Sequence, residues 1–189
     1  MFRRNFLKSS ALGSGIAFFP FEKIIYDYPK NKFNLNYAPH FGMFKHSAGE
    51  DLIDQLNFMA DEGFTAFEDN NLKKRSISDQ NKIASTLTKR NLRMGVFVAH
   101  SIYWKEPNLA SGNIDKRKEF LKEIRESVEV AKRVNAKWMT VVPGYKDLRL
   151  KDSYQQTNVI DSLKYACDIL EPYDLTMVLE PLNLSLIHI

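Results

Sequence analysis

A carboxylate closes the last long apolar stretch of the sequence. Residues 173–183 read YDLTMVLEPLN, which predicts a strand that ends at Glu180 and a chain turn at Pro181. An ionisable group at the end of so apolar a strand raises the free energy of the fold unless a partner compensates for it. Catalytic groups of parallel α/β proteins gather where strands reach their carboxyl ends. We therefore expect Glu180 to be the catalytic residue.

Further polar side chains follow the other predicted strands. Asn36 follows the first, Glu68 the second and His100 the third, directly after the apolar run VFVA. Parallel strands bring their carboxyl ends to one rim, and a rim of carboxylates and imidazoles can hold a divalent metal or move protons. The simpler alternative for each residue is an ordinary structural role, such as a surface carboxylate for Glu68.

The elements that must position these residues alternate along the chain. Predicted strands begin near residues 34, 65, 93, 138 and 176, and a helical pattern follows each of them except the last. This alternation predicts an α/β fold with a parallel sheet. A complete (β/α)8 TIM barrel needs about 250 residues, whereas this chain has 189. We expect residues 31–183 to form the first five strands of such a barrel, truncated at the C-terminus.

Four helices are predicted between these strands. The first begins at a capping box, residues 47–50, and carries an apolar stripe that ends at Gly63. The others cover about residues 78–90, 120–134 and 154–170, and in the last of them Ile160 and Cys167 should point inward. Cys167 is the single cysteine, so it cannot form an internal disulfide.

The composition narrows the class of protein. Hydrophobic residues make up 44% and charged residues 26% of the chain, which excludes a disordered protein and a membrane bundle. The net charge of +4 includes helix-surface runs such as Lys116 to Lys118. Nucleic-acid binding would require a basic stripe with interleaved aromatic residues. We therefore expect a small-molecule substrate and no nucleic-acid partner.

The first thirty residues form a separate segment. Residues 3–8 read RRNFLK, and a weakly apolar stretch from 11 to 21 follows. This segment resembles a twin-arginine export signal, which implies a periplasmic protein. It is too short and too rich in glycine for a stable membrane span. The alternative is a basic amphipathic N-terminus without a targeting role. Residues 1–30 lack a clear Ala-x-Ala site, so cleavage stays open.

Several segments together resemble one enzyme family. They are FNLN at 33–36, ADEGFTAFE at 60–68, the strand end at His100, LKYA at 163–166 and VLEPLN at 178–183. These segments are similar to hydroxypyruvate isomerase. More broadly, they resemble the xylose isomerase-like TIM barrels, which include ketose 3-epimerases and endonuclease IV. The last segment is the most specific of the five.

The resemblance implies a divalent metal ion, with Mg, Mn and Zn equally possible, and Glu180 as both metal ligand and acid–base group. His100 would orient the substrate oxygens, Asn36 and Glu68 would contact the substrate, and Trp104 would close over it. The implied reaction converts hydroxypyruvate to tartronate semialdehyde through an enediolate. The full-length parent could form a homo-oligomer.

The resemblance also has a departure. Residues 184–189 read LSLIHI, where the family continues into further βα units. This tail resembles translated adapter read-through, so we expect it to be artefactual and the fragment itself to be inactive. The alternatives are a ketose 3-epimerase acting on a sugar, or a sugar-binding barrel without catalysis. Endonuclease IV fits less well, because it needs more histidine ligands than this segment offers.

Overall fold

Parallel strands in chain order form the centre of the protein. The computed structural model describes residues 33–181, with β1 at Ala66–Phe67, β2 at Arg93–Met94, β3 at Trp138–Val141 and β4 at Thr176–Leu179. β1 pairs in parallel with β2, and β3 pairs in parallel with β4. An isolated parallel bridge between Val98 and Thr140 joins the two pairs. Each strand therefore lies beside its neighbour in sequence, which confirms the expected parallel α/β arrangement.

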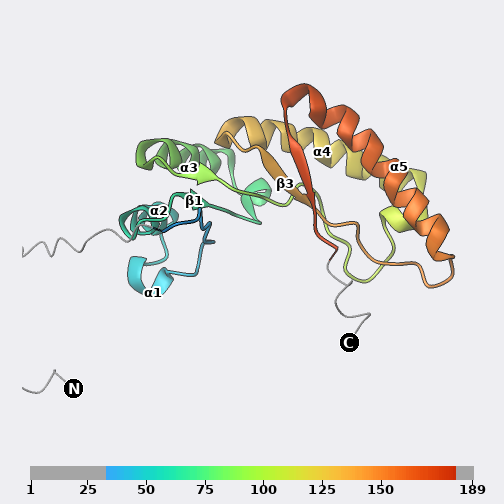
Figure 1. Ribbon diagram of the computed structural model, residues 1–189, viewed down its shortest axis with the longest axis horizontal. Coiled ribbons are helices and arrows are strands. Elements are labelled where there is room, and N and C mark those ends of the chain that lie inside the picture. The colour runs from blue at the N-terminus through green and yellow to red at the C-terminus, as the bar shows by residue number, and fades with distance from the viewer. Residues whose placement is uncertain (1–32, 182–189) are drawn as a thin grey trace, which may run out of the picture.

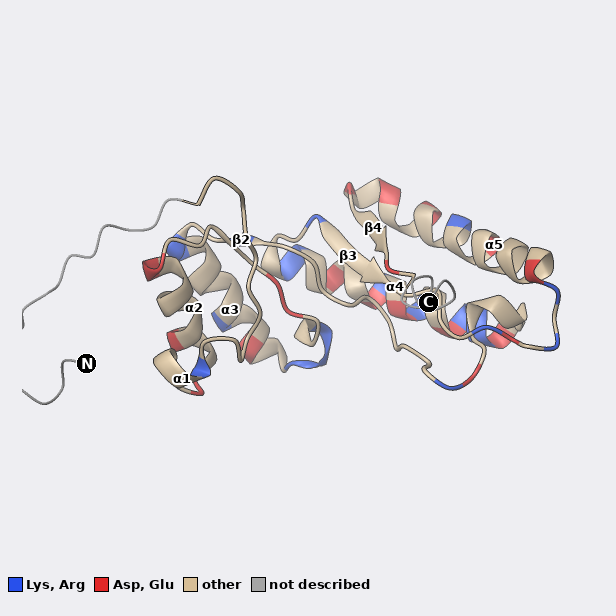
Figure 2. Cartoon of the chain, turned by 60° about the horizontal axis from the view of Figure 1, so that its bottom comes forward, with Lys and Arg blue, Asp and Glu red and all other residues tan. Residues whose placement is uncertain are grey.

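Helices precede each of these strands along the chain. They are α1 at Lys45–Ala48, α2 at Leu52–Asp61, α3 at Ile77–Arg90, α4 at Ile114–Val134 and α5 at Asp152–Leu170, with short 3-10 helices η2 at Leu72–Lys74, η3 at Leu109–Ser111 and η4 at Glu171–Tyr173. Helices α3, α4 and α5 pack side by side on one face of the strands (Figure 1). Charged residues are distributed along these helices, while β3 and β4 carry no charge (Figure 2).

The first predicted strand is not formed as a strand. Residues 33–37 are exposed, and the segment meets the end of β1 through an isolated parallel bridge between His40 and Glu68. The Glu68 amide donates to the Pro39 carbonyl over 3.2 Å. Proline has no amide hydrogen to donate, so Pro39 cannot support a regular ladder. The expected strand near residue 34 is therefore replaced by an extended segment.

The predicted start of the first helix is wrong. Ser47 lies inside the short helix α1, and Gly49 follows it with a φ of 85° that stops the helix. Asp51 instead caps α2, because its carboxylate accepts hydrogen bonds from the amides of Ile53 at 2.8 Å and Asp54 at 3.0 Å. An aspartate cap satisfies amides that a helix leaves unpaired. The other three helices extend the predicted ranges at their amino ends by one to six residues.

The helices return to the sheet through left-handed residues. Asn91 after α3, Asn135 after α4 and Asp174 after η4 have φ values of 53°, 54° and 54°. Asparagine and aspartate tolerate this conformation better than most residues with a Cβ atom. Each of the three is followed within three residues by the next strand. This recurring turn sets the spacing between helix and strand.

The core lies between the helices and the strands. Its fully buried members include Phe67 and Phe97 from the sheet side, Ile83 from α3 and Ile124 from α4. On α5 the prediction for Ile160 is wrong, because that side chain is 51% exposed, and Cys167 is partly buried. Ser162 occupies the buried position instead, where its hydroxyl accepts a hydrogen bond from Arg117 Nε over 3.0 Å.

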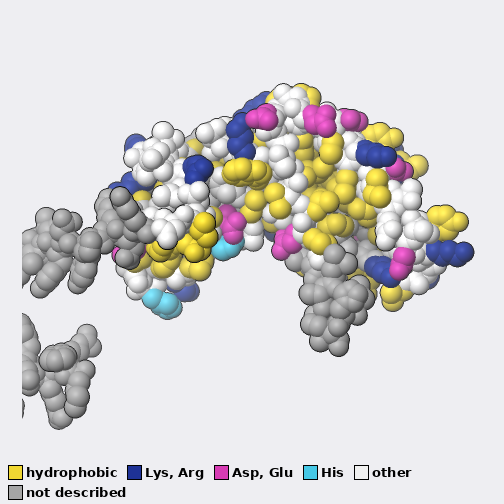
Figure 3. All heavy atoms as spheres, viewed as in Figure 1, with side chains coloured by type: hydrophobic (Ala, Val, Ile, Leu, Met, Phe, Trp, Pro, Cys, Tyr) yellow, Lys and Arg dark blue, Asp and Glu magenta, His cyan; other side chains and the backbone are white. Residues whose placement is uncertain are grey.

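The sheet presents apolar side chains to the solvent at β4. Val178 is 41% exposed and Leu179 is 48% exposed. Hydrophobic side chains gather over β4 and α5 on the face shown in Figure 3. Across residues 33–181, none of the helices combines the length and the apolar character needed to cross a bilayer.

Candidate functional site

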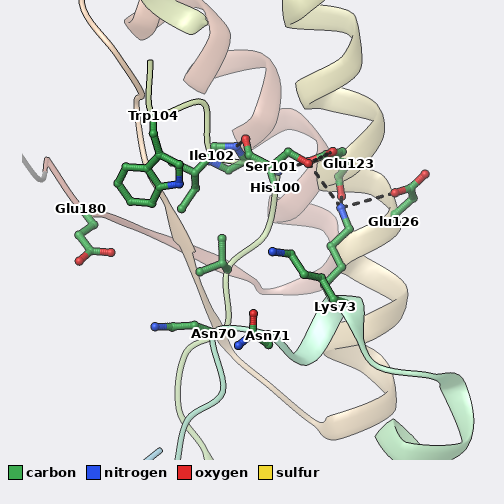
Figure 4. A pocket seen from close by; sticks show the side chains of 12 residues that line it. Asn70, Asn71, Lys73, His100, Ser101, Ile102, Trp104, Glu123, Glu126 and Glu180 are labelled. Carbon is green, nitrogen blue, oxygen red and sulfur yellow. Dashed lines mark hydrogen bonds and ion pairs between the residues drawn. The ribbon is translucent and has the colours of Figure 1, made fainter. Parts of the chain in front are cut away.

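A cavity of about 570 Å³ opens at the carboxyl ends of the strands. It is lined by residues that follow β1, β2 and β4, together with one face of α4: Asn70, Asn71, Lys73, Lys74, Val98, His100, Ser101, Ile102, Trp104, Glu123, Glu126 and Glu180. Three of the five site residues predicted from the sequence, Glu180, His100 and Trp104, therefore line one cavity. Figure 4 shows Glu180 on one side of it, with Glu123 and Glu126 on the other.

Glu180 stands directly after β4. Its amide donates to the carbonyl of Val141 over 3.0 Å, which continues the pairing of β4 with β3 by one residue. The side chain is exposed at the mouth of the cavity. A solvated carboxylate at the carboxyl end of a strand is placed to accept or return a proton from a bound substrate. Glu180 therefore lies at the carboxyl end of the strands, the position predicted for it.

His100 is buried, with 5% of its surface exposed, and both ring nitrogens contact the backbone. Nε2 accepts a hydrogen bond from the Val142 amide over 3.1 Å, so the proton resides on Nδ1, which donates to the Ser101 carbonyl over 2.8 Å. Burial lowers the pKa of His100 below its usual value. His100 therefore lines the cavity as a neutral ring, and in this conformation neither nitrogen is free to contact a substrate.

Trp104 lies in the loop between β2 and α4. Its side chain is 64% exposed and lines the cavity together with Ile102 (Figure 4). The loop is fixed beyond the tryptophan, because Pro107 forms a parallel bridge with Tyr145 and its carbonyl accepts a hydrogen bond from Lys116 Nζ over 3.0 Å. An exposed indole beside a polar cavity offers an apolar face to a bound ring or chain.

Two predicted residues lie outside the cavity lining. The Glu68 carboxylate contacts the His40 ring, with 2.8 Å between Oε1 and Nε2. Asn36 is exposed, and its Oδ1 accepts a hydrogen bond from the hydroxyl of Thr65, the residue before β1. Asn36 is therefore at the amino end of the sheet, and its predicted place at the carboxyl rim is wrong. The reason is register: His40 rather than Asn36 is level with the end of β1.

Sequence reasoning missed the basic and acidic side chains of the cavity. Lys73 is largely buried, and its ammonium lies 3.5 Å from a carboxylate oxygen of Glu126. Burial lowers the pKa of Lys73, and the carboxylates of Glu123 and Glu126 oppose that shift. Lys73 belongs to a run of three basic residues that is typical of a solvated surface. Its position just after the end of β1 was the available signal.

The described residues do not assemble a set of metal ligands. Between residues 33 and 181 the structure contains no cluster of three or more His, Cys, Asp or Glu side chains arranged to hold a metal ion. Glu180 offers a solvated carboxylate at the rim, whereas the half-exposed Glu126 carboxylate across the cavity lies 3.5 Å from the Lys73 ammonium. One oxygen ligand does not hold Mg²⁺, Mn²⁺ or Zn²⁺ firmly. These residues do not by themselves fit a complete metal centre.

Parallel strands in chain order, helices on one face and polar groups at the carboxyl ends define part of a β/α barrel. The chain belongs to the xylose isomerase-like TIM barrel family, whose sequence model matches residues 56–188. This confirms the predicted fold class. Comparison with curated proteins gives no significant match.

Solved structures share this fold. An AP endonuclease of family 2 from Brucella melitensis is 21% identical with a TM-score of 0.58, over 78% of this chain and 55% of that one. D-psicose 3-epimerase with D-tagatose, from Clostridium cellulolyticum H10, is 15% identical with a TM-score of 0.62, over 79% and 53%. The IolI protein with a zinc atom is 17% identical with a TM-score of 0.56, over 76% and 51%. The chain thus spans about half the length of these structures.

Proposed function

We propose that a complete barrel containing these strands is an isomerase that converts hydroxypyruvate to tartronate semialdehyde. The observation that carries this proposal is the convergence of Glu180, His100 and Trp104 on one cavity at the carboxyl ends of the strands. Family membership supports an isomerase or epimerase class, and the likeness of the segment that ends in Glu180 to hydroxypyruvate isomerase supports the particular reaction.

The reaction needs a group that moves one proton between adjacent carbons. A carboxylate at the position of Glu180 can remove a proton from the hydroxymethyl carbon of hydroxypyruvate and return it to the former carbonyl carbon. The hydroxyl proton passes to the former carbonyl oxygen, which yields the isomeric aldehyde. A divalent ion, for which Glu180 would be one ligand, would polarise the carbonyl when bound. The indole of Trp104 would limit the access of water to the cavity.

One cation of the cavity, Lys74, supports an anionic substrate over a neutral sugar, although three glutamates also line the cavity. Lys73 and Lys74 both line it, and Lys73 is already held by carbonyl and carboxylate groups. Lys74 is exposed and makes no ion pair with another side chain of residues 33–181. Its ammonium can therefore pair with the carboxylate of hydroxypyruvate. The ketose 3-epimerase alternative rests on the fold it shares with D-psicose 3-epimerase and on the exposed indole.

The test follows the conversion of hydroxypyruvate by NMR with Mg²⁺, Mn²⁺ or Zn²⁺ added. It uses two proteins: the 189-residue chain, and a longer protein expressed from the reading frame that is recovered from source DNA beyond the codon for Asn183. We expect the longer protein to isomerise hydroxypyruvate and to lose activity with a chelator, and the 189-residue chain to be inactive. Epimerisation of D-fructose without action on hydroxypyruvate would assign the ketose epimerase. Sugar binding without turnover would indicate a binding barrel.

We also propose that residues 1–30 direct export through the twin-arginine pathway. These residues lie outside the part of the chain that the structure describes, as do residues 184–189 of the expected artefactual tail. The proposal rests on the paired arginines Arg3 and Arg4. Fused to a reporter that is active only after export, residues 1–35 should give signal, and replacement of both arginines by lysine should abolish it.

A further inference from the structure

A buried ammonium joins three parts of the chain beside the cavity. Lys73 Nζ donates one hydrogen bond to the carbonyl of Ala99, at the end of the β2 segment, and another to the carbonyl of Glu123 in α4, each over 3.0 Å. The Lys73 side chain is 18% exposed. An ammonium has three donors, and the Glu126 carboxylate lies within 3.5 Å of this one. Lys73 thus connects η2 with α4 and with the residues that follow β2. Figure 4 shows it beside Glu123 and Glu126 of α4.

The same helix holds the residues on both sides of His100. The Glu123 carboxylate accepts hydrogen bonds from the Ser101 amide and, over 2.7 Å, from the Ser101 hydroxyl. The Ser127 hydroxyl donates to the Ala99 carbonyl over 2.6 Å, so that oxygen accepts from both Ser127 and Lys73. Residues 99 and 101 are therefore each fixed to α4, with His100 between them.

We propose that Lys73 is a positioning residue for the cavity, acting through the 99–101 segment on His100. The ammonium holds the Ala99 carbonyl, which fixes the position of the neighbouring imidazole ring in the cavity lining. In that position Nε2 of the ring accepts a hydrogen bond from the Val142 amide. The ring also packs edge-on against Phe120, with centroids 5.0 Å apart. This role rests on the proposed function in one respect, that the cavity is the active site.

A merely structural role for Lys73 gives a different expectation. If the ammonium only contributes to general stability, its loss should accelerate hydrogen exchange throughout the core by a common factor. If it positions the 99–101 segment, exchange should accelerate locally. The Ser101 and Val142 amides report on that segment, because one donates to Glu123 and the other to His100. The amide of Leu92, which donates to the Leu87 carbonyl over 2.8 Å, reports on the distant end of α3.

The experiment compares Lys73→Met with Lys82→Met in the full chain. Lys82 forms only an exposed ion pair with Asp79 on α3 and provides the matched control. In Lys73→Met we expect the Ser101 and Val142 amides to exchange roughly tenfold faster or more relative to Leu92, with no such difference in Lys82→Met. Imidazole ¹⁵N spectra should show loss of the single Nδ1-protonated form of His100 in Lys73→Met alone.

Equal acceleration at all three amides, or an unchanged imidazole spectrum, would overturn the proposal. Should Lys73→Met not fold, Lys73→Gln decides the question, because its shorter, neutral amide keeps a donor near the two carbonyls but loses the charge. It should give a smaller acceleration at the Ser101 and Val142 amides, and equal acceleration at these two and at Leu92 would equally refute the positioning role. None of these measurements requires turnover, so a failed isomerase assay and a failed positioning role are separate results.

Discussion

The amide of Val142 donates a hydrogen bond to Nε2 of His100 over 3.1 Å, so the end of β3 determines which nitrogen of that imidazole carries the proton. With Nε2 accepting, the ring must be neutral and protonated on Nδ1. Protonation of Nε2 would turn the Val142 amide and the ring into two donors facing each other.

This contact predicts a pH dependence of stability. Burial holds the pKa of His100 below its unfolded value, so the unfolded chain binds more protons as the pH falls through that value. The contribution of His100 is fully present above about pH 6.5 and is lost as the pH falls towards the folded pKa. Urea denaturation from pH 8 to pH 5 should show this loss. His100→Gln should flatten the curve in this window, and an unchanged slope in that variant would contradict the assignment.

A buried carboxylate anchors the turn after β1. Asp69 is 3% exposed, and Arg75 contacts both of its oxygens, through Nε at 2.5 Å and Nη2 at 3.2 Å. Removal of one partner leaves the other charge uncompensated, so Asp69→Asn should lower the free energy of unfolding by about 3 kcal/mol. Chemical denaturation measures this loss. Asp115→Asn, in an exposed pair with Lys118, should change it by less than about 1 kcal/mol. A similar small effect of both variants would contradict the anchoring role.

The end of the tryptophan-bearing loop depends on a glycine. Gly112 has a φ of 69°. A Cβ atom there would lie 2.7 Å from the side-chain nitrogen Nδ2 of Asn158, which donates a hydrogen bond to the Ala110 carbonyl. Gly112→Ala should therefore destabilise the protein by roughly 1–2 kcal/mol, measured by thermal unfolding. Adding Asn158→Ala should relieve the steric part only. Full recovery in the double variant would show that the positive φ contributes nothing.

Lys74 and Glu180 should have separable effects in the catalytically complete protein. Lys74→Met should raise the KM for hydroxypyruvate about tenfold and leave the KM for a neutral ketose unchanged, since only the keto acid carries a charge. Glu180→Gln should lower kcat by about a hundredfold or more with either substrate, because the amide cannot accept the proton. Steady-state kinetics on both substrates checks these outcomes. Equal effects of Lys74→Met on both substrates would remove the argument for a keto acid.

The sequence predicted what depends on local pattern. Alternating apolar runs located β1 to β4, and the position of Glu180 after such a run located it at the rim. Register was not predictable for Asn36, because the bridge between His40 and Glu68 depends on contacts between separate segments. Lys73 was missed for a related reason: a lysine in a basic run has the same local pattern whether its ammonium is solvated or buried between two carbonyls.

Pairing between sequence neighbours also bears on how the chain acquires its fold. The 33–40 segment, β1, β2, β3 and β4 are adjacent in the sheet in the order in which a ribosome makes them. Each new strand and its preceding helix can therefore dock on a surface that has already been synthesised, without waiting for a distant partner. During translation the sheet can then grow by successive short loop closures. Within residues 33–181, β4 is the last strand to be added.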